Sequence, residues 1–203
     1  MKHITFEDKK VYPSKVVCVG RNYKKHIQEL KNENPEEIVL FIKPNSSISE
    51  DIYKPEKPCR YEGEISLIFE KGQPVGVGFG IDLTLVEEQN RLKQKGLPWE
   101  KAKAFDRSAI FSKFIRISPD MVESLRLELW INGDLKQSGS VRDMIYSPDQ
   151  LLKEAKKYFS FYDYDILMCG TPEGVGSFNR GDIFEGKIFL ENLFLTGGKW
   201  KVK

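Results

Sequence analysis

The chain has 203 residues, with 32 basic and 30 acidic side chains and a formal net charge of +2. This near balance gives no support for a nucleic-acid or anionic-membrane partner. We expect one domain over residues 1–203, because a chain of this length with 40% apolar residues can bury one sizeable core.

Three cysteines and two histidines limit the metal chemistry. Cys18, Cys59 and Cys169 are widely spaced and form no CxxC pair, which favours a reducing compartment. Only His3 and His26 offer imidazole, so a zinc site with several histidines is excluded and any metal would be held mainly by oxygen. The N-terminus lacks the apolar run of a signal peptide, and no stretch is long enough to span a membrane. We therefore expect a soluble, cytoplasmic protein.

Short apolar runs of strand length dominate the chain. In chain order we expect strands at 15–19, 38–42, 65–69, 114–117, 125–131, 165–169, 183–190 and 191–196. The clearest is LRLELWI, whose aliphatic residues recur at every second position before Asn132-Gly133, a strong hairpin-turn signal. Helices are expected at 22–32, at 84–95 with Thr84 as N-cap, and at 148–159 with Ser147 as N-cap. The pattern predicts a β-rich chain with a few surface helices.

Two glutamates stand at the entrance of the strand RYEGEISLIFE, Arg60 to Glu70. Strand residues alternate between faces, so Glu62 and Glu64 share one face. Two carboxylates about 7 Å apart along a strand repel each other unless a cation lies between them. An exposed strand end with solvated glutamates would give the same pattern.

A second stretch, VGVGFGIDLT, places three alternating glycines and Asp82 on one strand face, which predicts room for something other than side chains. A hairpin that folds back about Gln73 would place Asp82 opposite Glu64. Three carboxylates, those of Glu62, Glu64 and Asp82, could then converge on Mg²⁺, with water completing an octahedron. The glycines do not have the GxGxxG spacing of a dinucleotide-binding loop.

Three further segments carry side chains suited to catalysis. His26 and Glu29 are three residues apart on the expected helix, where a carboxylate can orient an imidazole as a general base, although a surface pair would look the same. Lys103 lies among alanine and phenylalanine residues, and it could stabilise an oxyanion or extend to the surface. The segment CGTPEGVG follows an expected strand as either a binding loop or a plain turn.

Taken in this order, these segments resemble the fumarylacetoacetate hydrolase family, most closely its short, single-domain members of the acylpyruvate hydrolase and oxaloacetate decarboxylase type. The matching stretches are GRNYKKH, LFIKP, YEGEISLIFE, IDLT followed by Gln89, KGLPWEKAKAF, INGDLKQ, DMIYSP and GTPEGVGSFNRGD. The resemblance implies a β-rich α+β fold, a mixed β-sandwich and β-roll that is usually a homodimer. It also implies a bound Mg²⁺ or Mn²⁺ ion, and Ca²⁺ is a further hard-ion candidate.

The resemblance implies roles for individual residues as well. The implied metal ligands are Glu62, Glu64 and Asp82. The implied water-activating dyad, on a helix that acts as a lid, is His26 with Glu29. The residues that would stabilise the oxyanion are Lys103 and Gln89. The residues that would contact the substrate are Thr171 and Arg21.

Two features depart from the family pattern. The family usually follows its aspartate with T-A-R-D, whereas here Asp82 leads into TLVEE, so Val86 stands where an arginine is expected. That arginine normally supports the oxyanion or a substrate carboxylate, so its absence leaves the substrate range and the rate open. In addition, only 17 residues separate Glu64 from Asp82, because a helix usually found there is missing.

The expected function is that of a metal-dependent hydrolase that cleaves a C–C bond in a small β-diketo acid of the acylpyruvate type. A water activated by His26 and Glu29 would attack the more distant carbonyl, and the metal would act as a Lewis acid. One alternative uses the same site without an attacking water, for oxaloacetate decarboxylation or tautomerisation or for isomerisation of a dienoic diacid. The other alternative is a non-catalytic relative, which Val86 favours and the joint presence of the other site residues opposes.

Overall fold

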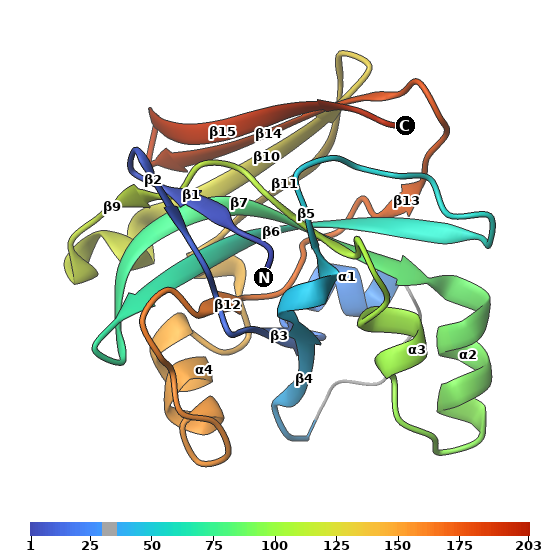
Figure 1. The fold of residues 1–203 in the computed structure, drawn as a ribbon, viewed down its shortest axis with the longest axis horizontal. Coiled ribbons are helices and arrows are strands. Elements are labelled where there is room, and N and C mark those ends of the chain that lie inside the picture. Colours follow the sequence, from blue (N-terminus) through green and yellow to red (C-terminus); the bar gives the residue numbers. More distant parts are fainter. Residues whose placement is uncertain (30–35) are drawn as a thin grey trace.

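The computed structural model describes residues 1–29 and 36–203. It contains a curved 9-stranded mixed sheet, a 4-stranded antiparallel sheet that packs across one of its faces, and a 2-stranded hairpin near the N-terminus (Figure 1). Helices in the described part of the chain are few and short, and they lie around the edges of the large sheet. The β-rich fold expected from the sequence, a mixed sandwich with a few surface helices, is confirmed.

The elements have the following bounds. The strands are β1 (Ile4–Phe6), β2 (Lys9–Val11), β3 (Lys15–Gly20), β4 (Val39–Pro44), β5 (Ile48–Ser49), β6 (Cys59–Glu70), β7 (Gln73–Leu85), β8 (Ala109–Phe111), β9 (Ile115–Arg116), β10 (Leu125–Ile131), β11 (Asp134–Ser140), β12 (Ile166–Met168), β13 (Gly176–Ser177), β14 (Ile183–Leu190) and β15 (Leu193–Lys201). The α-helices are α1 (Lys24–Glu29), α2 (Val86–Gln94), α3 (Glu100–Lys103) and α4 (Pro148–Ala155). The 3₁₀-helices are η1 (Asn45–Ser47), η2 (Pro119–Ser124) and η3 (Val141–Asp143).

The large sheet has the strand order β4-β3-β12-β6-β7-β8-β5, with β13 beside β6 and β9 beside β7. The smaller sheet has the order β11-β10-β14-β15. Between them lies a core to which β10 contributes Leu127 and Leu129, and β6 contributes Ile65 and Leu67. Each such side chain contributes about 1.5–3 kcal/mol when it is fully buried. Within the described residues, no helix is long and apolar enough to cross a membrane.

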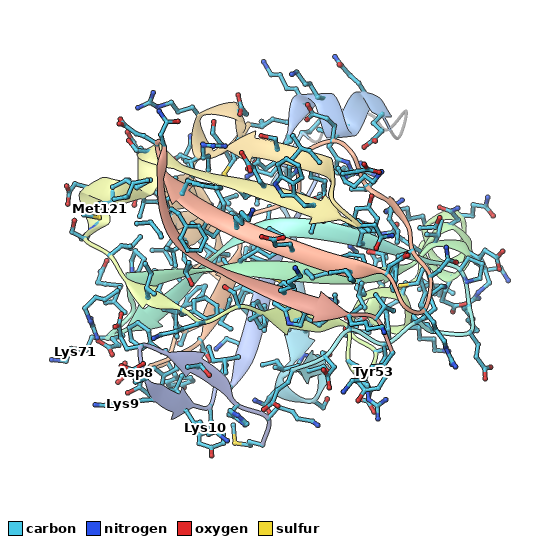
Figure 2. All side chains as sticks on the ribbon, turned by 90° about the horizontal axis from the view of Figure 1, so that it is seen from above. Asp8, Lys9, Lys10, Tyr53, Lys71 and Met121 are labelled. Atoms are coloured by element: carbon cyan, nitrogen blue, oxygen red, sulfur yellow. The ribbon has the colours of Figure 1, made fainter. Side chains whose placement is uncertain are left out.

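The hairpin of β6 and β7 lies at the centre of the large sheet and carries the candidate carboxylates. Its turn consists of Lys71 and Gly72, which both have positive φ angles, 51° and 70°. Lys71 therefore lies at the periphery of the molecule (Figure 2). Because the turn is this short and a bulge follows it along the ladder, Asp82 pairs with Glu62. The expected pairing of Asp82 with Glu64 is wrong, and Glu64 faces Gly80 instead.

The glycines of β7 do share a face with Asp82, as the alternation predicts, but side chains fill the space beside them. A Cβ added at Gly78 would lie 3.0 Å from the ring of Phe114, and one added at Gly80 would lie 2.9 Å from Met168 Cε. The expectation that these glycines leave room for something other than side chains is therefore wrong at Gly78 and Gly80. They allow large apolar side chains to approach the backbone of β7 closely, and the polar site begins only at Asp82.

The local signals in the sequence vary in how well they place the helices and turns. Asn132 and Gly133 have φ angles of 54° and 88°, as the predicted tight turn requires. Ser147 caps α4 and forms a capping box with Gln150, which confirms the predicted start. The predicted cap at Thr84 is wrong, because this residue belongs to β7 and α2 begins at Val86. The predicted helix 22–32 is observed as α1, and its residues 30–32 lie outside the described residues.

Candidate active site

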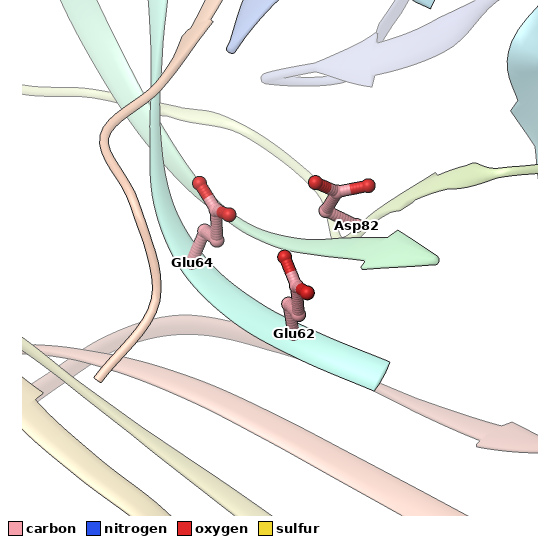
Figure 3. Close-up of side chains that lie close together, drawn as sticks. All are labelled: Glu62, Glu64 and Asp82. Atoms are coloured by element: carbon pink, nitrogen blue, oxygen red, sulfur yellow. The ribbon is translucent and has the colours of Figure 1, made fainter. Parts of the chain in front are cut away.

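Three carboxylates converge at the end of the β6–β7 hairpin. Glu62 and Glu64 extend from β6 and Asp82 from β7, and they offer oxygen atoms that all lie within 4.8 Å of one another (Figure 3). Their exposed fractions are 5%, 1% and 0%. The sequence alternative of solvated glutamates at a strand end is therefore wrong. Buried carboxylates this close together are costly unless cations compensate them, and an all-oxygen set of donors suits a hard divalent ion.

A lysine lies between two of these carboxylates. Lys103, at the end of α3, donates to Glu62 Oε2 at 2.7 Å and to Asp82 Oδ2 at 2.7 Å. Burial by itself would lower the pKa of Lys103, but the charges of Asp82 and Glu62 raise it above its usual range. Lys103 is only 4% exposed, so the alternative of a lysine that extends to the surface is wrong. The site holds a permanent ammonium group.

A second buried lysine contacts the same aspartate. Lys43 of β4 is fully buried, and its Nζ lies 2.7 Å from Asp82 Oδ1 in an ion pair that lacks the angles of a hydrogen bond. Among the described residues, this oxygen thus has charge compensation but no hydrogen-bond donor. Lys43 was not among the site residues expected from the sequence. A lysine inside the apolar run VLFIKP was the available signal, because a strand this apolar is expected to be buried.

Glu64 has less compensation than its neighbours. Its Oε2 accepts a hydrogen bond from the amide of Gly170 at 2.7 Å. Burial raises the pKa of Glu64 well above its usual range, and the charges of Asp82 and Glu62 raise it further. Lys43 and Lys103 therefore compensate the negative charges of Glu62 and Asp82 better than that of Glu64. Glu64 needs positive charge and Asp82 Oδ1 has no donor among the described residues, so the residues present fit a divalent ion.

The pair of His26 and Glu29 lies on α1. His26 Nδ1 is 3.2 Å from Glu29 Oε2, and His26 is 6% exposed, which rules out the alternative of a solvated surface pair. Burial lowers the pKa of His26, although the charges of Glu62 and Glu29 partly oppose this effect. The imidazole is thus neutral near pH 7. Because Nδ1–H is assigned to the carboxylate, Nε2 keeps a lone pair that can accept a proton.

The loop after β12 forms a wall of the site. Thr171 donates to the carbonyl of Gly63 at 2.9 Å and accepts from Gln137 Nε2 at 2.8 Å. The amide of Gly174 donates to Glu29 Oε1 at 3.1 Å, so the loop contacts the histidine dyad as well as β6. These bonds hold the loop against both β6 and the histidine dyad. Thr171 is 4% exposed, and its hydroxyl already has one hydrogen-bond acceptor and one hydrogen-bond donor.

The remaining candidates border the carboxylates. Gln89 is buried on α2, and its Oε1 accepts from Arg60 Nη2 at 3.4 Å. Arg60 in turn donates to Glu62 Oε1, a contact that the sequence analysis missed although residue 60 shares a strand face with Glu62. Arg21 has a φ of 60° and a buried Nε without an acceptor in the part of the chain that is described. The structure shows no direct contact between Arg21 and the carboxylates.

This arrangement combines three chemical functions. The carboxylates of Glu62, Glu64 and Asp82 offer oxygen ligands to a divalent cation. The ammonium of Lys103 offers a fixed positive charge where negative charge develops. The neutral imidazole of His26 can take up a proton. Together they suit reactions in which a carbon acid or a water loses a proton next to a carbonyl group.

The chain matches one family model and several known proteins. Residues 15–196 match the family model described as fumarylacetoacetate (FAA) hydrolase, C-terminal. The chain is 37% identical to an oxaloacetate tautomerase of Escherichia coli K12, over 84% of this chain and 87% of that protein. It is 35% identical to a mitochondrial oxaloacetate tautomerase of Arabidopsis thaliana, over 83% of each. A fumarylpyruvate hydrolase of Pseudomonas aeruginosa, solved with Mn²⁺ and pyruvate, has a TM-score of 0.88 at 26% identity and covers 99% of this chain and 95% of its own.

Proposed function

Because the chain belongs to the fumarylacetoacetate hydrolase family, we propose that it is a metal-dependent enzyme that interconverts the keto and enol forms of oxaloacetate. The observation that carries this proposal is the buried convergence of Glu62, Glu64 and Asp82 around the ammonium of Lys103. Relatives named oxaloacetate tautomerase at 37% and 35% identity support this choice of substrate. The sequence favours hydrolysis and offers tautomerisation as an alternative, and these relatives reverse that order of preference.

In this proposal Mg²⁺ or Mn²⁺ is held by the three carboxylates. When bound, such an ion supplies Lewis-acid polarisation of the 2-oxo group. Lys103 donates its three N–H groups to Glu62, Asp82 and Thr84 and keeps its proton because its pKa is raised, so its positive charge stabilises the oxygen on which negative charge develops. In the direction of the enol, His26 would take the proton from C3 on Nε2 and the enolate oxygen would gain a proton from water. In the reverse direction the enol would lose its O–H proton to water and His26 would return a proton to C3, while Glu29 holds the ring through Nδ1. Gln89 and Thr171 orient the substrate beside these groups.

A second candidate function is hydrolysis of an acylpyruvate, which the dyad of His26 and Glu29 favours. The same Nε2 that accepts a carbon-bound proton can accept one from water, and the resulting hydroxide would attack the more distant carbonyl. Collapse of the tetrahedral adduct would break the C–C bond and release a carboxylic acid and the enolate of pyruvate, which would take up the proton held by His26. A solved structure of similar fold that is named a fumarylpyruvate hydrolase supports this candidate. Oxaloacetate decarboxylation would use the same groups without an attacking water. A homodimer and a cytoplasmic location stay predictions from the sequence.

One set of assays tests these proposals. The enol absorbance of oxaloacetate is followed with the metal-free protein, with Mg²⁺ and with Mn²⁺, against metal and buffer without protein. Release of CO₂ and loss of acetylpyruvate are recorded in parallel. We expect accelerated ketonisation of the enol that requires both the protein and the ion and that disappears in Glu62→Gln. Equal rates for the wild type and Glu62→Gln would contradict the proposed function.

A further inference from the structure

Arg60 enters the site from the strand that carries the two candidate glutamate ligands. It pairs with Thr84 across the hairpin, and its guanidinium donates to Glu62 Oε1 from Nε at 3.0 Å and from Nη2 at 2.9 Å. Nη2 also lies 3.4 Å from Gln89 Oε1. The Arg60 side chain is 14% exposed. The guanidinium therefore lies at the rim of the site, between a candidate metal ligand and helix α2.

Val86 lies close to this arginine. Its amide donates to the carbonyl of Pro58 at 3.1 Å, and it follows Thr84, the cross-strand partner of Arg60, by two residues. Diagonal cross-strand neighbours are about 7–8 Å apart, within reach of a long side chain. Val86 is the first residue of α2, so a long side chain at position 86, where the family resemblance places an arginine, can reach the same rim of the site as Arg60.

The guanidinium retains hydrogen-bond donors for a ligand. Arginine has five N–H groups in a planar fork, and the contacts with Glu62 and Gln89 use only Nε and Nη2. In residues 1–29 and 36–203, Nη1 has no acceptor. Its neighbourhood is rich in positive charge as well. The pKa of Lys93 falls to about 8, first because the lysine is buried and then because Arg21, Lys103 and Arg60 repel its proton.

We propose that Arg60 binds the second carboxylate of a dicarboxylic 2-oxo acid and so supplies the guanidinium that Val86 cannot. This inference rests on the proposed function, which places the 2-oxo acid unit at the metal centre. The two N–H groups of Nη1 can donate to that carboxylate, and release of the long contact from Nη2 to Gln89 Oε1 would allow two parallel hydrogen bonds, which an ammonium cannot form in the same geometry. The site therefore selects diacids over monoacids that share the same oxo-acid unit.

Two stable ligands that differ only at the second carboxylate test this selection without turnover. L-malate and L-lactate are titrated calorimetrically into the Mn²⁺-loaded protein. We expect the wild type to bind malate more tightly, by about 10–100-fold, because one charge-assisted contact is worth that much. Arg60→Gln should lose most of this preference, with lactate binding unchanged. Arg60→Lys, which keeps the charge but not the fork, should retain part of it.

Two further variants sharpen the test. Adding Val86→Arg to Arg60→Gln should restore the preference for malate, since this change returns a guanidinium to the rim of the site. Arg116→Gln serves as the matched control, because Arg116 pairs with Glu70 at the surface, away from the carboxylates, and should keep the wild-type preference. Titration of Mn²⁺ alone should show no loss of affinity in Arg60→Gln, because removing a cation from Glu62 does not weaken its binding of another.

Two results would overturn the inference. If Arg60→Gln weakens the binding of malate, lactate and Mn²⁺ alone to the same degree, Arg60 only positions Glu62. If the preference for malate is the same in Arg60→Gln and the wild type, another group binds the second carboxylate. Both results are independent of oxaloacetate turnover. A wild type that prefers malate through Arg60 but does not tautomerise oxaloacetate would contradict the proposed function and leave the binding role intact.

Discussion

Lys103 and Asp82 form a buried ion pair in which Nζ lies 2.7 Å from Oδ2. The lysine comes from α3 and the aspartate from β7, so the pair also fixes the helix against the end of the hairpin. Breaking a buried pair by removing one partner leaves an uncompensated charge, which costs about 3–5 kcal/mol. The third N–H of the ammonium is donated to Thr84 Oγ1 at 2.6 Å, so in the proposed reaction Lys103 acts on the substrate through its positive charge. In the proposed function, Lys103 therefore serves both the stability of the site and its chemistry.

Lys103→Met separates these two contributions. We expect turnover of oxaloacetate to fall by about 10²–10³-fold, the typical effect of losing one preorganised group that stabilises the developing negative charge. The metal-free variant should also unfold at a lower temperature, whereas Mn²⁺ should stabilise it more than it stabilises the wild type, because the ion replaces the missing charge. Thermal melts with and without Mn²⁺ and steady-state assays measure both effects. Lys101→Met, at an exposed position of the same helix, is the control and should change neither. Undiminished turnover in Lys103→Met would exclude the assigned role.

Glu64→Gln tests the metal centre. In the wild type, Mn²⁺ at about 100 times its Kd should add about 2.7 kcal/mol of stability, which raises Tm by about 5–10 °C in a chain of this size. The variant should lose this shift. Without metal it should be at least as stable as the wild type, because one crowded carboxylate has been removed. Glu70→Gln, at the far end of the same strand, should keep the full Mn²⁺ shift. An unchanged shift in Glu64→Gln would show that the ion binds elsewhere.

The sequence predicted which faces the site residues occupy but not how the strands align. Alternation along β6 correctly placed Glu62 and Glu64 together, and the shared face of Asp82 followed from the same period of two. The register depended on whether the turn formed at Lys71-Gly72 or further along. Hairpin pairing shifts with each residue in the turn, and the bulge after Ile68 shifts it again, so composition alone could not decide it.

Side chains that come from other parts of the chain were harder to predict. Lys43 is 39 residues before Asp82 in the sequence and meets it only because β4 packs beside α3 in the folded chain. The filling of the glycine face by Phe114 likewise depends on a segment whose position the local pattern does not fix. Arg60 is different, because its strand face was predictable. What the sequence did not indicate is that α2 places Gln89 beside the guanidinium of Arg60.

Asp165→Asn tests a buried carboxylate outside the site. Asp165 accepts hydrogen bonds from the hydroxyl of Ser14 at 2.7 Å and the amide of Tyr162 at 2.9 Å, and it forms an ion pair with Lys15. Burial would raise the pKa of Asp165, but these donors outweigh it and lower the pKa. Its contribution is therefore full above the unfolded pKa, about 3.9, and is lost as the pH falls below that value. We expect the variant to lose roughly 3 kcal/mol at pH 7.

Denaturant titrations at several pH values measure this contribution. The difference in unfolding free energy between the wild type and Asp165→Asn should shrink as the pH falls through the acid range. Asp163→Asn is the control, because Asp163 accepts from the amide of Lys71 at an exposed position. A difference that grows on acidification would show that the sign of the pKa shift is wrong.

Glu29→Gln tests how the dyad sets the pH dependence. The pKa of His26 is lowered, mainly by burial, so the acid limb of a reaction that needs the neutral imidazole should lie below pH 6.5. The charge and hydrogen bond of Glu29 raise this pKa, so removing the charge should move the limb to still lower pH. The rate should also fall, by no more than the roughly 10²–10⁴-fold that a general base supplies.

His26→Asn should abolish the acid limb and reduce acylpyruvate hydrolysis more than oxaloacetate decarboxylation, because only hydrolysis needs an activated water. Profiles of kcat/KM measure both variants, and a limb that moves to higher pH in Glu29→Gln would exclude His26 as the titrating base.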